Sequence, residues 1–523
     1  MKQSLVFLQP LMLRLIVLIY PSVRPEPRPS LLLTSMSANM ILLPVTGCFI
    51  FVFWLFLGRS TRNPTSNFDI SRSPMVLAWL FFTKRYDFIS DTFKRTGQKM
   101  FRFRVLQYNV VALAGEEGRK LIFSEKNFNF REGYRILGAQ APRLQDINIK
   151  TEDNTNFAKL ILNLFRKERV VNVTPYLLED AERRMDQWGN DVKINPFEEM
   201  HSLVFQMTIR MATCRELADN LEATARLSEL FLLHEQALSP ISFFLPWFPG
   251  RAKQTKQKAT TAMFELLSRY VDLRRKSSVK SSDVIDTLIA DGYDDSTIID
   301  ITLGIIFAGV FNTGMVACWT LIHLGDKFKW KAKVAEEVAA LLLNYASESD
   351  PTQRRFSAVP LDAWEEEMPN LDFVIKETMR FNLAVIALRR NLGGDMVVGE
   401  NTIRDGDFVA YSFGDAHLND QIYSDPFSFD PARFSDEEHQ DKSISKVSLP
   451  FLGWGAGRHP CPGMRAAKLE IKLAVAMFLS KFDYDIVDAS GKYPKRLPRP
   501  DRNNIQGAKP IGDPCYFKLQ KKI

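Results

Sequence analysis

The sequence predicts a mainly α-helical fold with small β-sheets, arranged as a single large domain behind an N-terminal membrane helix. Apolar residues recur at three- and four-residue spacing from about residue 150 to 345, which is typical of helices that bury one face. Short apolar runs between turn residues occupy residues 74–135 and return after Leu388, as expected for small sheets. No repeat or long linker divides the chain after residue 70, so its 523 residues predict one large domain.

Two apolar stretches lie near the N-terminus. Residues 5–20 are interrupted by a proline and an arginine and would span a bilayer poorly. They fit a signal-like segment, a membrane-lying helix or an upstream extension of the reading frame. Residues 40–57 are 18 uncharged positions, which is long enough to cross a bilayer. Arg59 and Arg62 follow this stretch and favour a cytoplasmic position for the chain that comes after it.

These patterns predict four parts of the chain. They are an N-terminal extension at residues 1–39, a transmembrane helix at 40–58, a linker at 59–74 and the main domain at 75–523. The five cysteines are scattered and give no disulfide framework, which fits a main domain in a reducing compartment.

The charge pattern favours a membrane surface or an acidic partner over nucleic acid. The net charge of +7 is modest for this length, and no basic stripe interleaved with aromatic residues suggests nucleic-acid binding. The apolar segment Ser239–Gly250 is followed by Arg251, Lys253, Lys256 and Lys258. An aromatic tip with a basic rim fits the membrane interface, and the alternative is a loop that packs its aromatic side chains into the core.

A glycine-rich loop, Trp454–Gly463, holds Cys461 directly before a predicted helix. Gly455 and Gly457 allow positive φ and a close approach of the backbone to a flat ligand. The free N–H groups at the start of the helix favour an anionic sulfur, and a thiolate on haem iron promotes O–O cleavage. The loop therefore indicates oxygen activation. A buried structural cysteine is the alternative, and a zinc site is disfavoured because the cysteines form no close pairs.

This loop resembles the haem-binding signature of the cytochrome P450 family. Gly457, His459, Cys461 and Gly463 stand at the positions of the pattern, and Trp454 replaces its usual phenylalanine. The resemblance implies the fold of that family, with haem b as the cofactor and Cys461 as the axial ligand of the haem iron. It covers the main domain and leaves the N-terminal part of the chain unmatched.

Three charged residues match a second element of the family. Glu377 and Arg380 lie three positions apart on a predicted helix and share one face. Alone, such a pair is usually a solvated ion pair of little worth. Together with Arg433 downstream, it resembles the buried Glu-Arg-Arg network of the family, whose role is structural and fixes the segment that presents the cysteine loop.

A long apolar helix is predicted around Ala308 and Gly309. The resemblance implies that this helix crosses the oxygen side of the haem and that the two small residues leave room for O₂. The usual acid and threonine of the family are replaced by Phe311 and Asn312, so proton delivery would run through ordered water oriented by Asn312 or Thr313. This arrangement is similar to the branch that includes steroid and bile-acid hydroxylases and prostacyclin synthase.

The haem propionates require cationic partners. His459 matches the family position before the cysteine, and Arg390 matches a strand arginine often used for this purpose, with Arg389 as an equally close competitor. The usual tryptophan–arginine motif of an earlier helix is not visible, and the weaker candidates there are Lys159, Arg166 and Arg169. For any one of these arginines, a solvated surface charge is the alternative.

The predicted substrate pocket is apolar. Such a wall would bind a sterol, terpenoid or fatty-acyl skeleton by burial, at about 25 cal/mol per Å². For each residue, ordinary core packing is the alternative. The candidate lining residues are Phe307, Phe311, Ala384, Val385 and Ile386.

The resemblance implies a monooxygenase that inserts an oxygen atom from O₂ into an apolar terpenoid, sterol or other lipid-like secondary metabolite. Electrons would come from NADPH through a separate, flavin-containing NADPH-cytochrome reductase, because the chain carries no flavin or nicotinamide fingerprint. We expect a single-pass protein of the endoplasmic reticulum membrane with a cytoplasmic catalytic domain. The alternatives are a reductase-independent peroxide isomerase or dehydratase and a non-catalytic haem-binding protein.

Overall fold

The computed structural model describes residues 68–70, 73–138, 141–147, 149, 157–238, 250–435, 444–504 and 507–522. These residues belong to one compact unit, Arg62–Ile523. The predicted N-terminal extension, the predicted transmembrane helix and most of the predicted linker lie outside the described residues, as do residues 239–249 of the aromatic segment.

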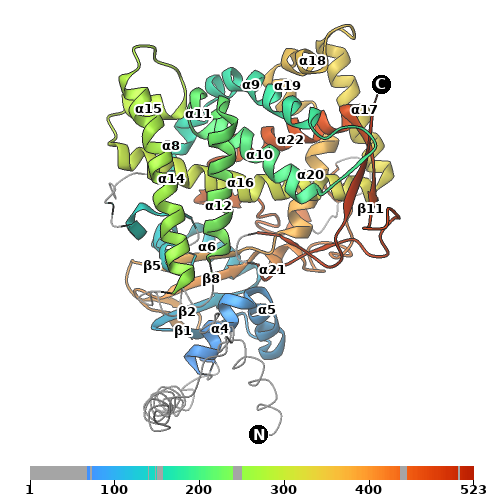
Figure 1. The fold of residues 1–523 in the computed structure, drawn as a ribbon. Coiled ribbons are helices and arrows are strands. Elements are labelled where there is room, and N and C mark those ends of the chain that lie inside the picture. The colour runs from blue at the N-terminus through green and yellow to red at the C-terminus, as the bar shows by residue number, and fades with distance from the viewer. Residues whose placement is uncertain are drawn as a thin grey trace, which may run out of the picture. The chain divides into compact units, whose positions relative to one another are not determined.

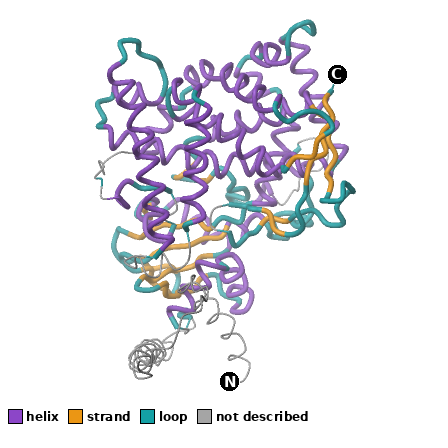
Figure 2. The backbone as a smooth tube through the Cα atoms, viewed as in Figure 1, coloured by secondary structure: helices purple, strands orange, loops and turns teal. Residues whose placement is uncertain are grey.

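The described unit is mainly helical, with short strands gathered beside the helices (Figure 2). This confirms the predicted mainly α-helical fold with small β-sheets, whereas the predicted membrane helix lies outside the described residues. The helices are α4 (Pro74–Thr83), α5 (Arg85–Thr96), α6 (Gly115–Ser124), α7 (Phe130–Leu137), α8 (Phe157–Leu164), α9 (Lys167–Asp186), α10 (Pro196–Ala212), α11 (Arg215–Asp219), α12 (Leu221–Gln236), α14 (Arg251–Lys276), α15 (Val284–Ala290), α16 (Asp295–Asp326), α17 (Phe328–Tyr345), α18 (Thr352–Ala358), α19 (Leu361–Glu366), α20 (Pro369–Asn382), α21 (Phe413–His417) and α22 (Met464–Lys481).

The largest sheet has the strand order β1-β2-β8-β5-β3. Strands β2 and β8 run parallel, and the other neighbouring pairs are antiparallel. Figure 1 shows α4 and α5 close to β1 and β2, where phenylalanine rings of α4, α5 and β1 pack together. The strands are β1 (Met100–Val105), β2 (Tyr108–Leu113), β3 (Phe128–Asn129), β5 (Ile386–Asn391) and β8 (Phe408–Ser412).

The prediction of a small sheet at residues 74–135 is only half right. This region supplies β1, β2 and β3, but the rest of it forms the helices α4 to α7. A short apolar run fits a buried helix as well as a strand, so periodicity alone could not separate the two.

Among the described residues, three smaller sheets lie outside the cysteine loop. Strand β14 (Tyr516–Lys521) lies between β11 (Phe482–Val487) and β4 (Val192–Ile194) and pairs antiparallel with both. The other two are the hairpin of β6 (Met396–Val398) with β7 (Asn401–Ile403) and the pair β12 (Arg499–Pro500) with β13 (Pro510–Ile511).

Helix α16 is the central helix of the core. Among the described residues it is the one helix long and apolar enough to cross a membrane, yet 67% of its most apolar window is buried inside the protein. Its length and hydropathy are therefore those of a core helix covered by protein on most sides. The side chain of Asp294 caps it by accepting the N–H of Thr297 at 2.6 Å, which satisfies a donor in its first turn.

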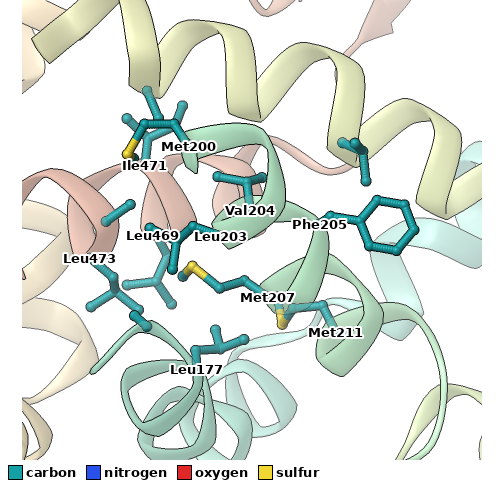
Figure 3. Packing of buried hydrophobic residues seen from close by; sticks show 14 of the residues in the cluster. Leu177, Met200, Leu203, Val204, Phe205, Met207, Met211, Leu469, Ile471 and Leu473 are labelled. Carbon is teal, nitrogen blue, oxygen red and sulfur yellow. The ribbon is translucent and has the colours of Figure 1, made fainter. Parts of the chain in front are cut away.

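Helix α10 packs between α9, α16 and α22 and fixes the position of α22. Figure 3 shows Leu203 and Met207 of α10 beside Leu469 of α22 and Leu177 of α9. Leu177, Leu203 and Met207 are fully buried, and each such side chain contributes about 1.5–3 kcal/mol. This packing holds the N-terminal end of α22, which directly follows the cysteine loop, in a rigid frame.

Candidate functional site

The cysteine loop is a tight hairpin. Strand β9 (Gly455–Ala456) pairs antiparallel with β10 (His459–Pro460), and the N–H of Cys461 donates to the carbonyl of Trp454 at 2.7 Å. Gly455 and Gly457 have φ of +70° and +56°. An added Cβ would lie 2.4 Å from the carbonyl oxygen of His459 at the first position and 2.3 Å from that of Phe123 at the second. Both positions therefore require glycine.

Cys461 is only partly buried, whereas the other described cysteines, Cys214, Cys318 and Cys515, are buried. Burial raises the pKa of the Cys461 thiol, and the N–H of Gly463 opposes this by donating to the sulfur. The N–H at the start of α22 thus acts in the predicted direction and favours the anionic sulfur, while burial opposes it. A coordinated metal ion would deprotonate this thiol, since metal-bound thiols lose their proton outright.

A buried arginine without a carboxylate partner lies near this loop. The guanidinium of Arg389 donates from Nη1 to the carbonyl of Leu388 at 2.8 Å and is hydrogen-bonded to the side chain of Tyr134, while its Nε has no hydrogen-bond partner. It lies 4.9 Å from the ring centroid of Phe130, and the ring of His459 stacks on the same phenylalanine at 5.8 Å. Burial lowers the pKa of Arg389, as expected for a desolvated cation with no anion beside it.

The charge of Arg389 also acts on His459. Burial, followed by Arg389, lowers the pKa of His459 to about 4, so the ring is neutral at physiological pH. A haem would bring carboxylates to this cluster, and a buried guanidinium without a counter-charge is otherwise costly. The donor set of Cys461, Arg389 and His459 therefore fits a haem with its two propionates.

Arg390 does not face this cluster. Its Nη1 pairs with Glu132 at 3.4 Å, and its Nε donates to the carbonyl of Gly406 at 3.3 Å, on the opposite face of β5. Successive side chains of a strand point to opposite faces, so only one of two adjacent arginines can reach the cysteine loop. The structure thus places Arg389, and not Arg390, beside His459 of the cysteine loop. Of the weaker candidates, Arg169 donates to the carbonyls of Leu164 and Met211.

Glu377, Arg380 and Arg433 form one buried network. Arg380 pairs with Glu377 through two bonds, at 2.6 and 2.7 Å, and Nε of Arg433 lies 3.2 Å from Oε1 of Glu377. Glu377 and Arg380 are fully buried and Arg433 is nearly so. The three residues that the sequence matched to a family network are thus in direct contact.

This network ties α20 to the loop that follows α21. Arg380 donates to the carbonyls of His417 at 2.6 Å and Pro426 at 2.9 Å, and Arg433 donates to the carbonyl of Ser424 at 2.9 Å. The imidazole of His417 continues the link, because its Nε2 accepts the N–H of Leu452 at 2.9 Å, two residues before Trp454. The network therefore reaches the segment that enters the cysteine loop.

Ala308 and Asn312 are exposed in the middle of the otherwise buried helix α16. They lie one turn apart on one face, and Nδ2 of Asn312 donates to the carbonyl of Ala308 at 2.9 Å. This bond uses an amide N–H and leaves the side-chain oxygen of Asn312 as an acceptor. We call the face formed by Ala308 and Asn312 the open face of α16.

Gly309 and Thr313 lie off the open face. A Cβ at Gly309 would come within 2.8 Å of Cγ2 of Thr208 on α10, so the glycine accommodates a neighbouring helix. Thr313 is 2% exposed, against the exposed side chain of Asn312. The structure thus places Ala308 on the open face and Gly309 against α10, and of the two candidates for orienting water it exposes only Asn312.

The predicted pocket residues fall into two groups. Phe307 and Phe311 pack against each other with ring centroids 4.9 Å apart, and Phe307 is partly exposed beside the open face. Ile386 belongs to the core cluster between the large sheet and α4, which corrects its assignment to the pocket. Ala384 is nearly buried, and Val385 packs against a second core cluster.

Two other site residues are placed at the ends of the loop. Trp454 is partly buried and packs against the main core cluster. Gly463 precedes the first residue of α22, and a Cβ there would meet nothing within 4 Å. The sequence did not predict the contact of the loop with Phe123. Gly457 indicates that another part of the backbone lies close to the loop, but the sequence does not show which residue it is.

Comparisons with known proteins identify the family of this chain. A model of the cytochrome P450 family matches residues 71–500. The chain is 25% identical over 497 residues to the cytochrome P450 monooxygenase AacuE of Aspergillus aculeatus, covering 92% of this chain and 98% of the relative. It is 26% identical over 456 residues to the cytochrome P450 monooxygenase dmxR5 of a Cryptosporiopsis species, covering 84% and 89%.

A solved structure, retinoic acid bound cyanobacterial CYP120A1, has the same fold. It matches with a TM-score of 0.66 at 19% identity and covers 85% of this chain and 96% of its own. The match of the family model over most of the chain, the relatives and the cysteine loop lead to one conclusion. The chain belongs to the cytochrome P450 family and is a P450 monooxygenase that uses haem and electrons from a redox partner.

Proposed function

We propose that this enzyme is a membrane-anchored monooxygenase that hydroxylates or further oxidises an apolar terpenoid, sterol or other lipid-like secondary metabolite. The observation that carries the proposal is Cys461, a partly buried thiol at the N-terminal end of α22. It is combined with the open face in the middle of α16, the helix that packs against both α10 and α22. A thiolate site, together with an accessible face on a helix that packs against α22, is what oxygen insertion requires.

The residues around the cysteine would each hold one part of the haem. Cys461 would bind the iron as the axial thiolate, while Arg389 and the neutral ring of His459 would receive the propionates. When bound, the haem supplies the reduction and cleavage of O₂. Gly455, Gly457 and Gly463 would allow the loop backbone to approach the ring closely.

The open face of α16 would form the oxygen side. Ala308 presents only a methyl group there, and Asn312 presents a side-chain oxygen that can orient a water molecule or a substrate hydroxyl. The amide of Asn312 does not ionise, so it would position a proton carrier and would not act as the acid itself.

The substrate class rests on the apolar wall and on the relatives. Phe307 lies beside the open face, and no charged side chain follows until Asp326 at the C-terminal end of α16. Other relatives include abscisic acid 8'-hydroxylase 1 and sterol 14-demethylase of Arabidopsis thaliana, each 24% identical. Their names, and the retinoic acid in the structural neighbour, support a ring-containing apolar substrate for this chain.

Electrons would come from NADPH through a separate flavin-containing cytochrome reductase. The sequence of residues 40–58 supports an anchor in the endoplasmic reticulum membrane, with contact to membrane lipid and the catalytic domain in the cytoplasm. A second candidate is a reductase-independent peroxide isomerase or dehydratase. The absence of an acid on the open face favours it, because such a reaction needs no external protons for O–O cleavage.

Haem absorption spectra and product-formation assays test these proposals. The reduced, carbon monoxide-bound protein should show the long-wavelength band of thiolate-bound haem, and Cys461→Ala should lose it. Product formation from an apolar substrate with NADPH, O₂ and reductase supports the monooxygenase. Turnover of a lipid hydroperoxide without reductase would favour the isomerase, and a Cys461→Ala variant that keeps the band would overturn both.

A further inference from the structure

Helix α6 carries a buried arginine that reaches the chain entering the cysteine loop. Arg119 is 1% exposed, and its Nε donates to the carbonyl of Ser448 at 2.9 Å. Its Nη1 donates to the hydroxyl of Tyr411 on β8 at 3.1 Å, while its Nη2 has no hydrogen-bond partner among the described residues. Ser448 lies six residues before Trp454, where the loop begins. Because a buried cation is costly unless hydrogen bonds satisfy it, these two bonds tie α6 to the chain before the loop.

The same helix holds the tip of the loop, one turn further along. The carbonyl of Phe123 accepts the N–H of Arg458 at 2.9 Å and lies against Gly457. Arg119 and Phe123 are four residues apart on α6, which is about 6 Å along the helix axis. Helix α6 therefore contacts this segment at two places, at Ser448 before the loop and at Arg458 in its tip.

Helix α6 is itself fixed to the large sheet. The hydroxyl of Tyr411 donates to Oδ2 of Asp415 at 2.7 Å, and the N–H of Gly115 at the start of α6 donates to the same oxygen at 2.8 Å. A Cβ at Gly118 would lie 2.9 Å from Cβ of Leu113, so the helix packs tightly against the end of β2. None of these contacts involves the loop, so α6 provides a fixed reference for it.

The residue after Ser448 has a strained backbone. Leu449 has φ of +52°, in the left-handed region that a leucine seldom adopts. Such a conformation persists only where the surrounding contacts hold it. On one side, Arg119 binds the carbonyl of Ser448. On the other side, the carbonyl of Pro450 accepts the hydroxyl of Tyr423 at 3.0 Å, so Leu449 is held between two fixed carbonyls.

The charge of Arg119 acts on another support of the loop. After burial and the charge of Arg380, the charge of Arg119 helps to lower the pKa of His417 to about 3. The imidazole is therefore neutral at physiological pH, and its Nε2 can accept the N–H of Leu452 at 2.9 Å. Arg119 thus supports the chain before the loop both directly and through His417.

We propose that Arg119 is a positioning residue for the iron ligand, and that α6 sets the place of Cys461 relative to the large sheet. The buried network of Glu377, Arg380 and Arg433 ties the loop to α20. Helix α6 is a second, independent tie, which fixes the same loop from the side of the sheet. Residues that orient a metal ligand typically change the affinity for the metal group by about 10–100-fold when they are replaced.

Variants of the full-length haem protein test this role. Arg119→Gln removes the charge and cannot reach both acceptors, while Arg119→Lys keeps the charge and can serve only one of them. We expect Arg119→Gln to transfer its haem to apomyoglobin about tenfold to hundredfold faster than the wild type. Part of the long-wavelength band of its reduced, carbon monoxide-bound form should move to shorter wavelength, because the sulfur is no longer held at the iron. Arg119→Lys should be intermediate in both measurements.

Arg85→Gln is the matched control. Arg85 is another buried arginine with two hydrogen bonds, to the carbonyls of Phe81 at 3.1 Å and Leu137 at 3.2 Å, and neither bond goes to the cysteine loop. Its replacement should lower the thermal stability, as that of Arg119 should, but leave the carbon monoxide spectrum unchanged. The comparison separates the loss of a buried arginine in general from the loss of the tie to the loop.

The strained residue gives a second test. Glycine adopts the left-handed conformation without strain, so the spectral change caused by Arg119→Gln should be smaller in a Leu449→Gly background. A double-mutant cycle measures this coupling. Purely additive effects would contradict the tie through Ser448.

Two further results would overturn the role of Arg119. One is an Arg119→Gln variant whose band position and haem transfer match those of the wild type. The other is the same band shift in Arg85→Gln. If Arg119→Gln does not accumulate as a folded protein, an unaltered band in Arg119→Lys would have the same meaning. None of these measurements requires turnover, so they do not depend on which substrate the enzyme oxidises.

Discussion

The cysteine side of the site and the open face of α16 are held in different ways. On the cysteine side, Glu377, Arg380 and Arg433 share several short bonds, and further hydrogen bonds carry the network to His417 and the loop. On the open face, Asn312 makes one hydrogen bond, to a carbonyl of its own helix. Each position on the cysteine side is fixed by several partners, whereas the open face is fixed only by the helix that carries it.

This difference separates the parts of a haem enzyme that must stay constant from those that can vary. The position of an iron ligand tolerates little error, so a buried network that fails when any member is lost is suitable there. The residues over the oxygen side determine substrate and proton supply, and a face without cross-links can exchange an acid and a threonine for Phe311 and Asn312 without loss of the fold.

The largest expected effect is on the cysteine side. Arg380→Ala would leave Glu377 as a buried charge with one remaining arginine and free two carbonyls, at a cost of about 3–5 kcal/mol of folding free energy. We expect little soluble protein with bound haem, measured by the absorbance ratio of haem to protein. A variant that retains its haem would show that the network is not what fixes the loop.

The two adjacent arginines of β5 give the second test. Arg389→Gln would remove a charged hydrogen-bond donor worth about 1.5–3 kcal/mol, which corresponds to about a tenfold to hundredfold loss of haem affinity. Arg390→Gln breaks the partly exposed pair with Glu132 and the hydrogen bond to the carbonyl of Gly406, and should cost about 0–1 kcal/mol of stability, with no effect on haem. Haem transfer to apomyoglobin measures both, and the reverse order of effects would restore Arg390 as the partner.

Acid should destabilise the cysteine side of the site. Burial and the charge of Arg380 lower the pKa of His417 from 6.5 to about 3. Below pH 6.5 this histidine is protonated in the unfolded chain but stays neutral in the native state. The folding free energy is therefore lost as the pH falls below 6.5, by up to about 1.4 kcal/mol per pH unit. Chemical unfolding at a series of pH values should show this slope, reduced in His417→Gln. An unchanged slope would assign it to other buried histidines.

Two glycines of α16 should respond in opposite directions. Gly309→Ala places a Cβ against the stiff side chain of Thr208, and the strain of about 1–3 kcal/mol exceeds the gain in helix propensity of about 1 kcal/mol. Gly304→Ala meets the ring of Phe157 at an ordinary 3.6 Å and should be stabilising. Thermal unfolding of the two variants measures the difference. If both substitutions are stabilising, α10 must shift to make room for the added methyl group at position 309.

The smallest effect on stability is expected on the open face. Asn312→Ala removes a bond on an accessible surface and should change the folding free energy by less than about 0.5 kcal/mol. It should nevertheless lower the product formed per NADPH, because the acceptor on the open face is gone. Thr313→Val is the matched change at the buried neighbour and should leave this yield unaltered, and the opposite result would assign the oxygen side to Thr313.

Sequence patterns could predict the features that depend on local spacing. The three-residue spacing of Glu377 and Arg380 placed them on one helix face, and the glycines around Cys461 predicted a tight loop. The choice between Arg389 and Arg390 could not be made in this way, because it depends on which face of β5 meets the loop. The contact of Thr208 with Gly309 could not be predicted either, because it arises only where α10 meets α16 from a distant part of the chain.

The order of strands in the small sheet of β4, β11 and β14 affects biosynthesis. Strand β14 is the middle one, yet it follows β4 by more than 300 residues, from Ile194 to Tyr516. While the ribosome is still translating the intervening helices, β4 has no strand to pair with, and its edge is available to chaperones or to other nascent chains. The three-stranded sheet can therefore form only late in synthesis, long after α16, against which β11 packs, has been made.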